Sequence, residues 1–363
     1  MRLRHLWLTD FRSFTSAELV PAPGLTAFVG ANGAGKTNLL EAIAYLASLS
    51  SFRGAPGEAL VRIGAEHAVV RAEVDLEAPG RSSPATVEAE LHPSGRDRVL
   101  LNRQPLRRIS DLLGTVRVTV FSPDDLALVK GGPAHRRRLL DDLVVAQSPR
   151  LGAVRADLDR VLRQRSTLLR QAGGRLGPDI ATTLDVWDAK LGQLGEALGE
   201  ARSRLVDQLE PLAAKSYDQV AVAAARVGVA YRPAWRDTGL ADALATARSD
   251  DVRRGTTTVG PHRDDVELTI AGLVARTHAS QGEQRSLALA LRLAGHHLVA
   301  DASGSPPLVL LDDVFSELDP DRSAALVTHL PAAQALLTTT GSMPAGTSPD
   351  LVIQVTGGRL VAS

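Results

Sequence analysis

Residues 30–37 read Gly30-Ala31-Asn32-Gly33-Ala34-Gly35-Lys36-Thr37 and fit the pattern G-x-x-x-x-G-K-[ST]. The apolar run 25–29 before them predicts a buried strand, and apolar residues at helical spacing after them predict a helix over 37–49. A glycine-rich turn in that position lets backbone N–H groups surround phosphate oxygens at the positive end of the helix. We therefore predict a site for ATP and Mg²⁺, with Lys36 on the β- and γ-phosphates and Thr37 on the metal. The expected nucleotide contacts in this stretch are Gly30, Ala31, Asn32, Gly33, Ala34, Gly35, Lys36, Thr37 and Asn38.

Lysine is rare in this chain, so the lysine in the motif is more informative than usual. Only four of the 41 basic residues are lysines, and the many arginines and alanines are typical of genome composition rather than of function. The alternative interpretation, a glycine-rich turn that binds nothing, is weakened by this bias and by the strand and helix around the motif. The four lysines are Lys36, Lys130, Lys190 and Lys215.

The composition sets limits on the class of protein. A length of 363 residues exceeds one ordinary core and predicts two lobes, and an apolar fraction of 44% is typical of a soluble globular chain. No apolar run approaches the ~18 residues that span a bilayer, and the first residues do not resemble a signal peptide. The absence of cysteine excludes disulfides and thiol catalysis and fits a cytoplasmic location. A net charge of zero means that any polyanion must bind through local basic patches.

An apolar run at 308–311 ends in two acids, Asp312 and Asp313. A buried parallel strand has this pattern, and its carboxyl end is where open α/β sheets bind ligands. We predict that Asp312 holds Mg²⁺ and that Asp313 orients or deprotonates the attacking water. The alternative is a strand that simply ends in an Asp-rich turn.

Residues 280–284 read Ser280-Gln281-Gly282-Glu283-Gln284 and precede a leucine-rich helical pattern. Ser280 and Glu283 fit a capping box, which predicts a helix N-terminus at this point. A capped helix N-terminus beside serine and glycine is also an anion site, so the two interpretations do not compete.

The order of expected elements gives an α/β segment, a mostly helical insertion and a second α/β segment. We expect one nucleotide-binding lobe, 1–130 with 256–363, and a helical lobe, 131–255. Other β segments are expected at 3–11, 68–120 (with a hairpin over 100–106), 227–231, 265–277, 308–311, 336–339 and 351–355. Further helices are expected at 134–171, 180–227, 281–300 and 320–329.

The order of these motifs resembles that of ABC-type ATPases. Residues 280–284 look like their signature motif, and Ser316-Glu317-Leu318-Asp319 resembles their D-loop. The gap between Thr37 and Ser280 is longer than in a transporter subunit and shorter than in a long coiled-coil SMC protein. That spacing, together with local matches over nearly the whole chain, is similar to the RecF family. The matching stretches are 11–14, 51–53, 120–126, 131–141 and 258–265. The two blocks around Phe121 and Val259 narrow the resemblance from the ABC class to the RecF family.

The resemblance implies an ABC-type ATPase head with a β subdomain and an inserted helical lobe. It implies that Ser280, Gly282 and Gln284 of one subunit complete the ATP site of another, so that ATP drives a two-fold dimer. Arg12 and Arg53 resemble positions that add positive charge around the phosphates, the alternative being ordinary surface arginines. The family also implies binding to DNA, at single-strand/duplex junctions or gapped DNA, and a role in recombinational repair. RecO and RecR as mediator partners, loading of the recombinase RecA and support of the SOS response follow from the same resemblance.

Three departures from the wider ABC pattern predict slow hydrolysis, with ATP acting mainly as a conformational switch. Asp313 stands where glutamate is usual, no convincing Q-loop glutamine lies near Ser122-Pro123, and threonines 338–340 replace the expected switch histidine. A non-hydrolysing ATP-switched DNA scaffold therefore remains an alternative. A transporter-type subunit is disfavoured because it predicts a short insertion, a Q-loop and that histidine. A small-molecule kinase would not explain residues 280–284.

A basic stretch is the candidate DNA surface. Between Arg96 and Arg138 there are ten Lys or Arg against four acids, a net +6 in a neutral chain. Aromatic residues are only 3% of the chain, so we expect backbone contacts without sequence preference rather than base stacking. The alternative is a solvated face or salt bridges to the helical lobe. The expected contacts are Arg96, Arg98, Arg103, Arg107, Arg108, Arg136, Arg137 and Arg138.

Overall fold

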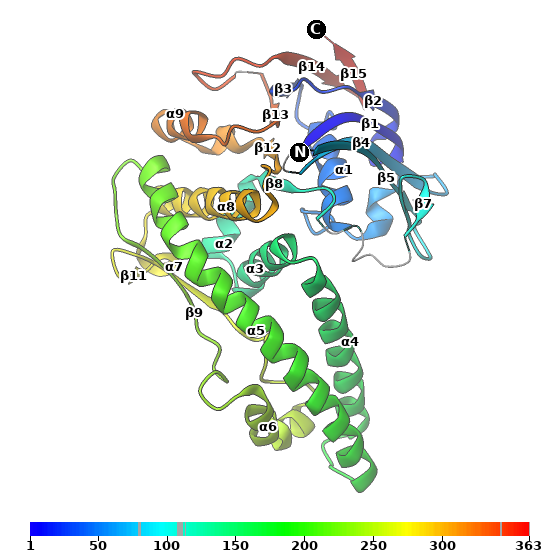
Figure 1. The fold of residues 1–363 in the computed structure, drawn as a ribbon, viewed down its shortest axis with the longest axis vertical. Helices are drawn as coiled ribbons and strands as arrows, with labels where there is room; N and C mark the ends of the chain where they lie inside the picture. Colours follow the sequence, from blue (N-terminus) through cyan, green and yellow to red (C-terminus); the bar gives the residue numbers. More distant parts are fainter. Residues whose placement is uncertain (79–80, 107–111, 113, 342, 363) are drawn as a thin grey trace. The chain divides into compact units, whose positions relative to one another are not determined.

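The structure is a computed structural model that describes residues 1–78, 81–106, 112, 114–341 and 343–362 (Figure 1). The chain forms two compact units. The first unit contains Met1–Leu126, Leu212–Ala225 and Ser280–Ser363, and the second contains Ala127–Pro211 and Arg226–Ala279. No helix in the described part of the chain is both long and apolar enough to cross a membrane.

An antiparallel sheet in the first unit has the strand order β2-β1-β4-β5-β6-β7. In strand β1, Leu6 and Leu8 are buried and Trp7 between them is partly exposed, as expected for a half-buried strand. One face of the sheet is therefore apolar and packs on the core. The strands are β1 (Arg2–Phe11), β2 (Phe14–Leu19), β4 (Ala68–Ala78), β5 (Arg81–Leu91), β6 (Arg98–Leu101) and β7 (Gln104–Pro105).

A second sheet in the same unit is parallel except at one edge, with the order β15-β14-β3-β13-β12-β8. Every residue of β12 is buried, because both faces of this sheet are covered. The parallel strands β3, β13 and β12 are adjacent, so their carboxyl ends meet at one edge. The strands are β3 (Leu25–Val29), β8 (Val118–Phe121), β12 (Leu308–Asp312), β13 (Ala335–Thr339), β14 (Leu351–Thr356) and β15 (Arg359–Ala362).

Helices pack on both faces of the parallel sheet. Helix α1 (Lys36–Ser48) contacts both sheets and lies in a core shared by Phe28, Leu310 and residues of β1. Helices α8 (Gln281–Ser303) and α9 (Pro320–His329) lie on the opposite face (Figure 1). Their Leu289 and Leu326 pack with the alternate β12 residues Val309 and Leu311. Short 3-10 helices complete the unit: η1 (Gly57–Leu60), η3 (Pro123–Leu126) and η4 (Val314–Glu317).

The second unit is mostly helical with one small antiparallel sheet, β11-β10-β9. Leu169, Leu184 and Val252 form a core among three of its helices. The long helix α5 continues through Pro211, and its residues from Leu212 onward belong to the first unit. The elements are α2 (Ala127–Lys130), α3 (Pro133–Gln147), α4 (Arg150–Gln171), α5 (Pro178–Val220), β9 (Val227–Tyr231), α6 (Leu240–Arg254), β10 (Val266–Ile270), β11 (Leu273–Val274) and α7 (Ala275–His278).

The boundaries expected from the sequence need three corrections. Residues 127–130 and 256–279 lie in the second unit, because α2 contacts α3 and α7 and β10 pairs with β9. Residues 212–225 lie in the first unit, because α5 runs across the boundary. The single β segment expected at 265–277 is a hairpin followed by a helical turn, since Ala271 and Gly272 both adopt positive φ. The helix expected over 134–171 is interrupted at Ser148 and Pro149.

Candidate nucleotide-binding site

The loop after β3 has a backbone shape that only glycine allows at several positions. Gly33 and Gly35 have φ values of +79° and +110°, in the left-handed region. A Cβ on Gly30 would lie 2.3 Å from the Val355 carbonyl oxygen, and one on Gly35 would lie 2.8 Å from Ser13 Oγ. The loop therefore packs tightly against its neighbours, and residues 31–33 remain exposed to solvent.

Lys36 lies over the loop that precedes it. Its Nζ donates to the carbonyl oxygens of Gly30 at 2.7 Å and Ala31 at 2.9 Å. Burial lowers the pKa of this ammonium, and the nearby carboxylates of Asp313 and Asp312 act in the opposite direction. A cation held against loop carbonyls is positioned to transfer to the oxygens of a nucleotide phosphate.

Thr37 and Asp312 are 275 residues apart in the chain and meet in the fold. Thr37 Oγ1 donates to Asp312 Oδ1 at 2.8 Å, and Thr338 Oγ1 donates to the same oxygen at 2.9 Å. Burial raises the pKa of Asp312, while these two hydrogen bonds and the charge of Arg53 lower it. A hydroxyl and a carboxylate are hard oxygen donors of the kind that Mg²⁺ shares with nucleotide phosphates. The residues present therefore fit the expected metal.

Asp313 has a strained backbone at the end of β12. Its φ of +48° is unusual for a residue with a side chain. Its N–H donates to Thr338 Oγ1 at 2.9 Å, which helps to fix this conformation. Asp313 is partly exposed, in contrast with Asp312, which is only 7% exposed. The two neighbouring acids thus differ in solvation, and their roles as metal ligand and water-activating residue stay predictions.

Thr338 is a site residue that the sequence interpretation did not assign. It was noted only as standing near the place of an expected histidine. In the structure it is 1% exposed, pairs in register with Asp312, and bonds both to that carboxylate and to the Asp313 backbone. A polar residue at the carboxyl end of a strand predicted to be buried was the available signal.

Arg12, Arg53 and Asn38, the other residues expected near the phosphates, have different surroundings. Arg12 is bound to both oxygens of the fully buried Glu41, at 2.8 Å each, and to the Ala59 carbonyl oxygen. Its charge is therefore already compensated, and its contact with phosphate remains a prediction. Arg53 is exposed and acts electrostatically on Asp312. Asn38 donates to Ser13 Oγ at 2.9 Å and supports the loop.

The expected capping box at the start of α8 is present. Ser280 Oγ accepts from Glu283 N–H at 3.3 Å, and the Glu283 carboxylate accepts from Ser280 N–H at 2.7 Å. A Cβ on Gly282 would lie 2.6 Å from Arg322 Nη2. Gln284 is only 4% exposed, so it does not offer its amide to a nucleotide on the surface.

Two arginines join this helix end to the loop that precedes α9. Arg285 donates to the backbone and side chain of Glu317. Arg322 donates to Asp319 and, at 3.0 Å, to Ser286 Oγ. The signature-like and D-loop-like segments are therefore physically connected within the first unit.

The basic stretch does not form a uniform surface. Arg136 is 6% exposed and donates to both oxygens of Asp265 and to two backbone carbonyls. It is therefore not available to DNA, and the expectation that it contacts DNA is wrong. Arg137 donates to the Asp264 carbonyl oxygen, and Arg138 forms an ion pair with Asp142 at 3.8 Å. The physical reason for Arg136 is that its guanidinium is buried and needs acceptors, which Asp265 and the Leu128 and Gly131 carbonyls supply. Arg96, Arg98 and Arg103 are exposed around β6, whereas Arg107 and Arg108 lie outside the described residues.

Comparison with known proteins identifies the family. The model of the RecF/RecN/SMC N terminal domain matches residues 2–342. A protein of Frankia alni named DNA replication and repair protein RecF is 46% identical, with 100% of this chain and 98% of that protein covered. The chain belongs to the RecF family. A Streptomyces avermitilis protein of the same name is 45% identical, with 93% of each chain covered.

Solved structures agree with this assignment. A structure of the recombination mediator protein RecF-ATP of the RecFOR pathway is 27% identical, with a TM-score of 0.90 and coverage of 99% and 97% of the two chains. An SMC head bound to a winged-helix domain of ScpA is 18% identical with a TM-score of 0.60, over 100% of this chain and 98% of that one, which shows the fold alone. The expected family and the expected ABC-type ATPase head are therefore confirmed.

Proposed function

We propose that the chain binds ATP with Mg²⁺ at the loop 30–38 and the carboxyl ends of β12 and β13. The observation that carries this proposal is the hydrogen bond between Thr37 and Asp312, beside Lys36. In the bound state Lys36 contacts the β- and γ-phosphates, and Thr37 and Asp312 hold the metal. Mg²⁺ would neutralise charge that develops on the phosphates. The likeness to a RecF-ATP structure supports this assignment.

Two chains assemble around two ATP molecules in this proposal. Ser280 and Gly282 at the N-terminus of α8 meet the γ-phosphate held by the loop of a second chain. The N-terminus of α8, which Ser280 caps, is the positive end of the helix dipole, and this supports contact with an anion. Arg285 and Arg322 connect the N-terminal end of α8 to the D-loop-like segment 316–319. Through this connection, formation of the dimer interface changes the position of Asp313.

The dimer acts on DNA in repair, since the relatives are named DNA replication and repair proteins. The DNA that it binds is a junction of single and double strands or a gapped duplex. Its protein partners are RecO and RecR. Through them it helps to load the recombinase and supports SOS induction. The location is cytoplasmic. Arg96, Arg98 and Arg103 are the exposed residues of the basic stretch that support DNA contact.

Hydrolysis is slow and releases the dimer. Asp313 carries the role of water activation, with a shorter side chain than the usual glutamate. A scaffold that never hydrolyses ATP is the second candidate, and the absence of a histidine at Thr338 favours it. A transporter-type subunit has no support from the family comparison.

ATP-dependent dimerisation measured by light scattering tests the proposal. Wild type should be monomeric without nucleotide and dimeric with ATP and Mg²⁺, and gapped DNA should favour the dimer. Lys36→Met should abolish dimerisation because ATP is lost, and Ser280→Arg should abolish it while ATP still binds to each monomer. Normal dimerisation of both variants would refute the composite site.

Substitution of the exposed arginines tests the DNA surface. The triple variant Arg96→Ala, Arg98→Ala, Arg103→Ala should bind gapped DNA at least about tenfold more weakly and show a smaller salt dependence, because phosphate contacts release counterions. Arg359→Ala, at another exposed position of the first unit, is the matched control. Equal loss in the control, or no loss in the triple variant, would exclude this surface.

A further inference from the structure

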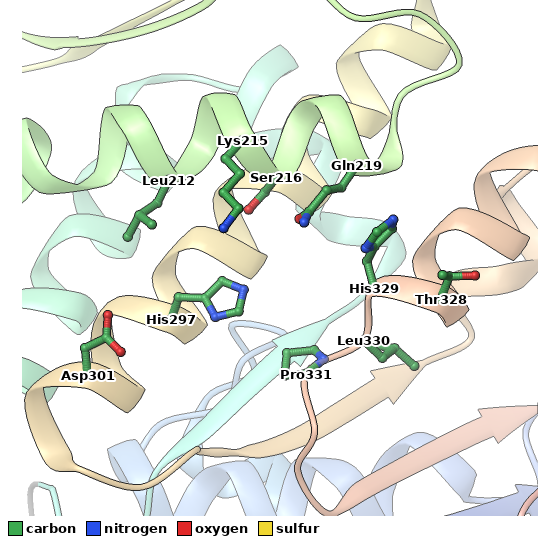
Figure 2. Close-up of a pocket in the computed structure, with 10 residues that line it drawn as sticks. All are labelled: Leu212, Lys215, Ser216, Gln219, His297, Asp301, Thr328, His329, Leu330 and Pro331. Carbon is green, nitrogen blue, oxygen red and sulfur yellow. The ribbon is translucent and has the colours of Figure 1, made fainter.

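A cavity of about 440 Å³ lies in the first unit, away from the residues of the ATP site. Its walls come from the last turns of α5, the second half of α8 and the C-terminal end of α9 (Figure 2). These three segments are far apart in the sequence and pack around the same face of the parallel sheet. Neither the motifs nor the proposed ATP chemistry uses any of the side chains in this cavity.

Four polar side chains converge on the cavity, namely those of Lys215, Gln219, His297 and His329 (Figure 2). Within the described part of the chain, none of the four makes a hydrogen bond or an ion pair. Gln219 and both histidines are partly buried, so water solvates them incompletely. Donors that are partly desolvated and unpaired are stabilised by a ligand that accepts from them.

The donors at one end of the cavity favour an anionic ligand there. Lys215 and Asp301 cancel in formal charge over the described lining, but Asp301 lies at the end away from Gln219 and His329 (Figure 2). Lys215 therefore leaves positive charge beside the amide and imidazole N–H donors of the other end. A metal site is not indicated, since no group of three or more His or acidic side chains in the described residues is arranged to hold a metal ion.

The side chains that line the cavity favour a carboxylate over a phosphate group. Arginine makes up all but four of the 41 basic residues, yet no arginine of the described residues lines the cavity. Arginine is the residue that binds phosphate in two-point geometry, so its absence in so arginine-rich a chain disfavours a phosphate group. Leu212, Leu330 and Pro331 instead supply apolar wall beside the donors. This combination suits a carboxylate that is carried next to an apolar group.

We propose that this cavity is a docking site for a peptide segment of a partner protein in which an acidic side chain neighbours an apolar one. The carboxylate accepts from Lys215 and from Gln219 or the imidazoles, and the apolar side chain contacts Leu330 and Pro331. Asp301 accepts from a backbone N–H of the same peptide. A cavity of this volume accommodates two or three side chains, which matches a short anchoring motif.

The cavity is lined by the two helices that begin at the signature-like and D-loop-like segments. Helix α9 begins at the cap Asp319 of the D-loop-like segment and ends at His329 in the cavity wall. Helix α8 begins at Ser280 and passes His297. A bound peptide therefore touches both helices whose N-terminal ends are joined by Arg285 and Arg322. Peptide binding itself requires no nucleotide, so it is independent of the proposed ATP function.

Selection from a random twelve-residue peptide library tests the proposal. The library is panned on the wild-type protein and, separately, on the Lys215→Glu variant. Peptides enriched only on wild type should contain Asp or Glu beside Leu, Ile or Phe. By fluorescence anisotropy, the best of these peptides should bind at least tenfold more weakly to Lys215→Glu and to His329→Ala, and its Asn/Gln analogue should not bind.

Lys190→Glu is the matched control, because Lys190 is an exposed lysine on the same helix but outside the cavity. It should bind the selected peptide as wild type does, and all variants should unfold at the wild-type temperature. The proposal is overturned if no enriched peptide depends on Lys215, if the dependent peptides lack an acid, or if Lys190→Glu loses binding equally. Displacement of the peptide by inorganic phosphate or AMP at comparable affinity would instead identify the cavity as a phosphate site.

Discussion

At the scale of single residues, Asp312 and Asp313 have the same side chain in different surroundings. Asp312 is buried and accepts two hydroxyl hydrogen bonds, whereas Asp313 is partly exposed on a strained backbone. A buried carboxylate oriented by hydroxyl groups, such as Asp312, is fixed in place to bind a metal ion. A solvent-accessible carboxylate, such as Asp313, can exchange a proton with water.

We predict that Asp313→Asn retains ATP binding and loses turnover by about 10²-fold or more, the typical contribution of a general base. Asp312→Asn should weaken Mg²⁺-dependent ATP binding itself, since the amide removes the charge that faces the metal. Single-turnover hydrolysis and nucleotide-binding titrations with and without Mg²⁺ separate the two effects. An Asp313→Asn variant that hydrolyses ATP at the wild-type rate would exclude Asp313 as the water-activating residue. A variant that loses turnover but keeps its DNA-dependent function would favour the non-hydrolysing scaffold.

Some of these residues could be predicted from the sequence because their signals are local. Lys36 and Thr37 belong to a contiguous motif, and Asp312 ends an apolar run. Thr338 could not be assigned a role, because that role depends on the register between β12 and β13. The pairing of Arg12 with Glu41 was equally hidden, since it depends on which side chains become fully buried.

At the scale of elements, α8 and β8 are joined by a buried polar contact. His296 is 1% exposed, and its Nδ1 lies 3.0 Å from Thr119 Oγ1. Burial, followed by the charge of His297, lowers the pKa of His296 to about 4. The ring is therefore neutral in the folded protein at neutral pH.

This contact predicts a specific loss of stability on acidification. An unfolded imidazole has a pKa near 6.5, so below that pH the unfolded state binds a proton that the native state does not. The stabilising contribution is complete above about pH 6.5 and is lost as the pH falls toward about 4. The free energy of unfolding of wild type should fall by roughly 2–3 kcal/mol more than that of His296→Asn over this interval. Urea unfolding of wild type and His296→Asn at about pH 6.5 and about pH 4 measures this difference. An equal loss of stability in the two proteins would exclude a neutral buried His296.

Element boundaries were predictable where a local signal marks them. Helix α9 begins after a capping Asp319 with Pro320 in its first turn, and β9 matches its expected range. The hairpin of β10 and β11 was missed because Ala271 adopts a positive φ that its residue type does not indicate. The block 258–265, which helped to identify the family, has a structural role that no pattern revealed. Its Asp264 accepts from Tyr231 and Trp235, and its Asp265 binds Arg136.

At the scale of the whole molecule, the chain contains both halves of the proposed composite site. The loop 30–38 and the capped N-terminus of α8 belong to the same unit. A site completed by a second chain and a site completed within one chain therefore use the same residues. Single substitutions do not separate these two arrangements, because each removes both copies of one half.

Mixing two inactive variants separates them. Lys36→Met retains an intact signature-like segment, and Ser280→Arg retains an intact phosphate loop. In a mixed dimer, the loop of the second variant faces the α8 N-terminus of the first, so one of two composite sites is complete. We predict that the mixture shows ATP-dependent dimerisation and turnover that neither variant shows alone, below the wild-type level because at most one site per dimer works. The double variant Lys36→Met with Ser280→Arg, mixed with wild type, is the control for nonspecific association. If the two single variants fail to complement while each remains folded, the ATP site is completed within one chain and the proposed dimer is wrong.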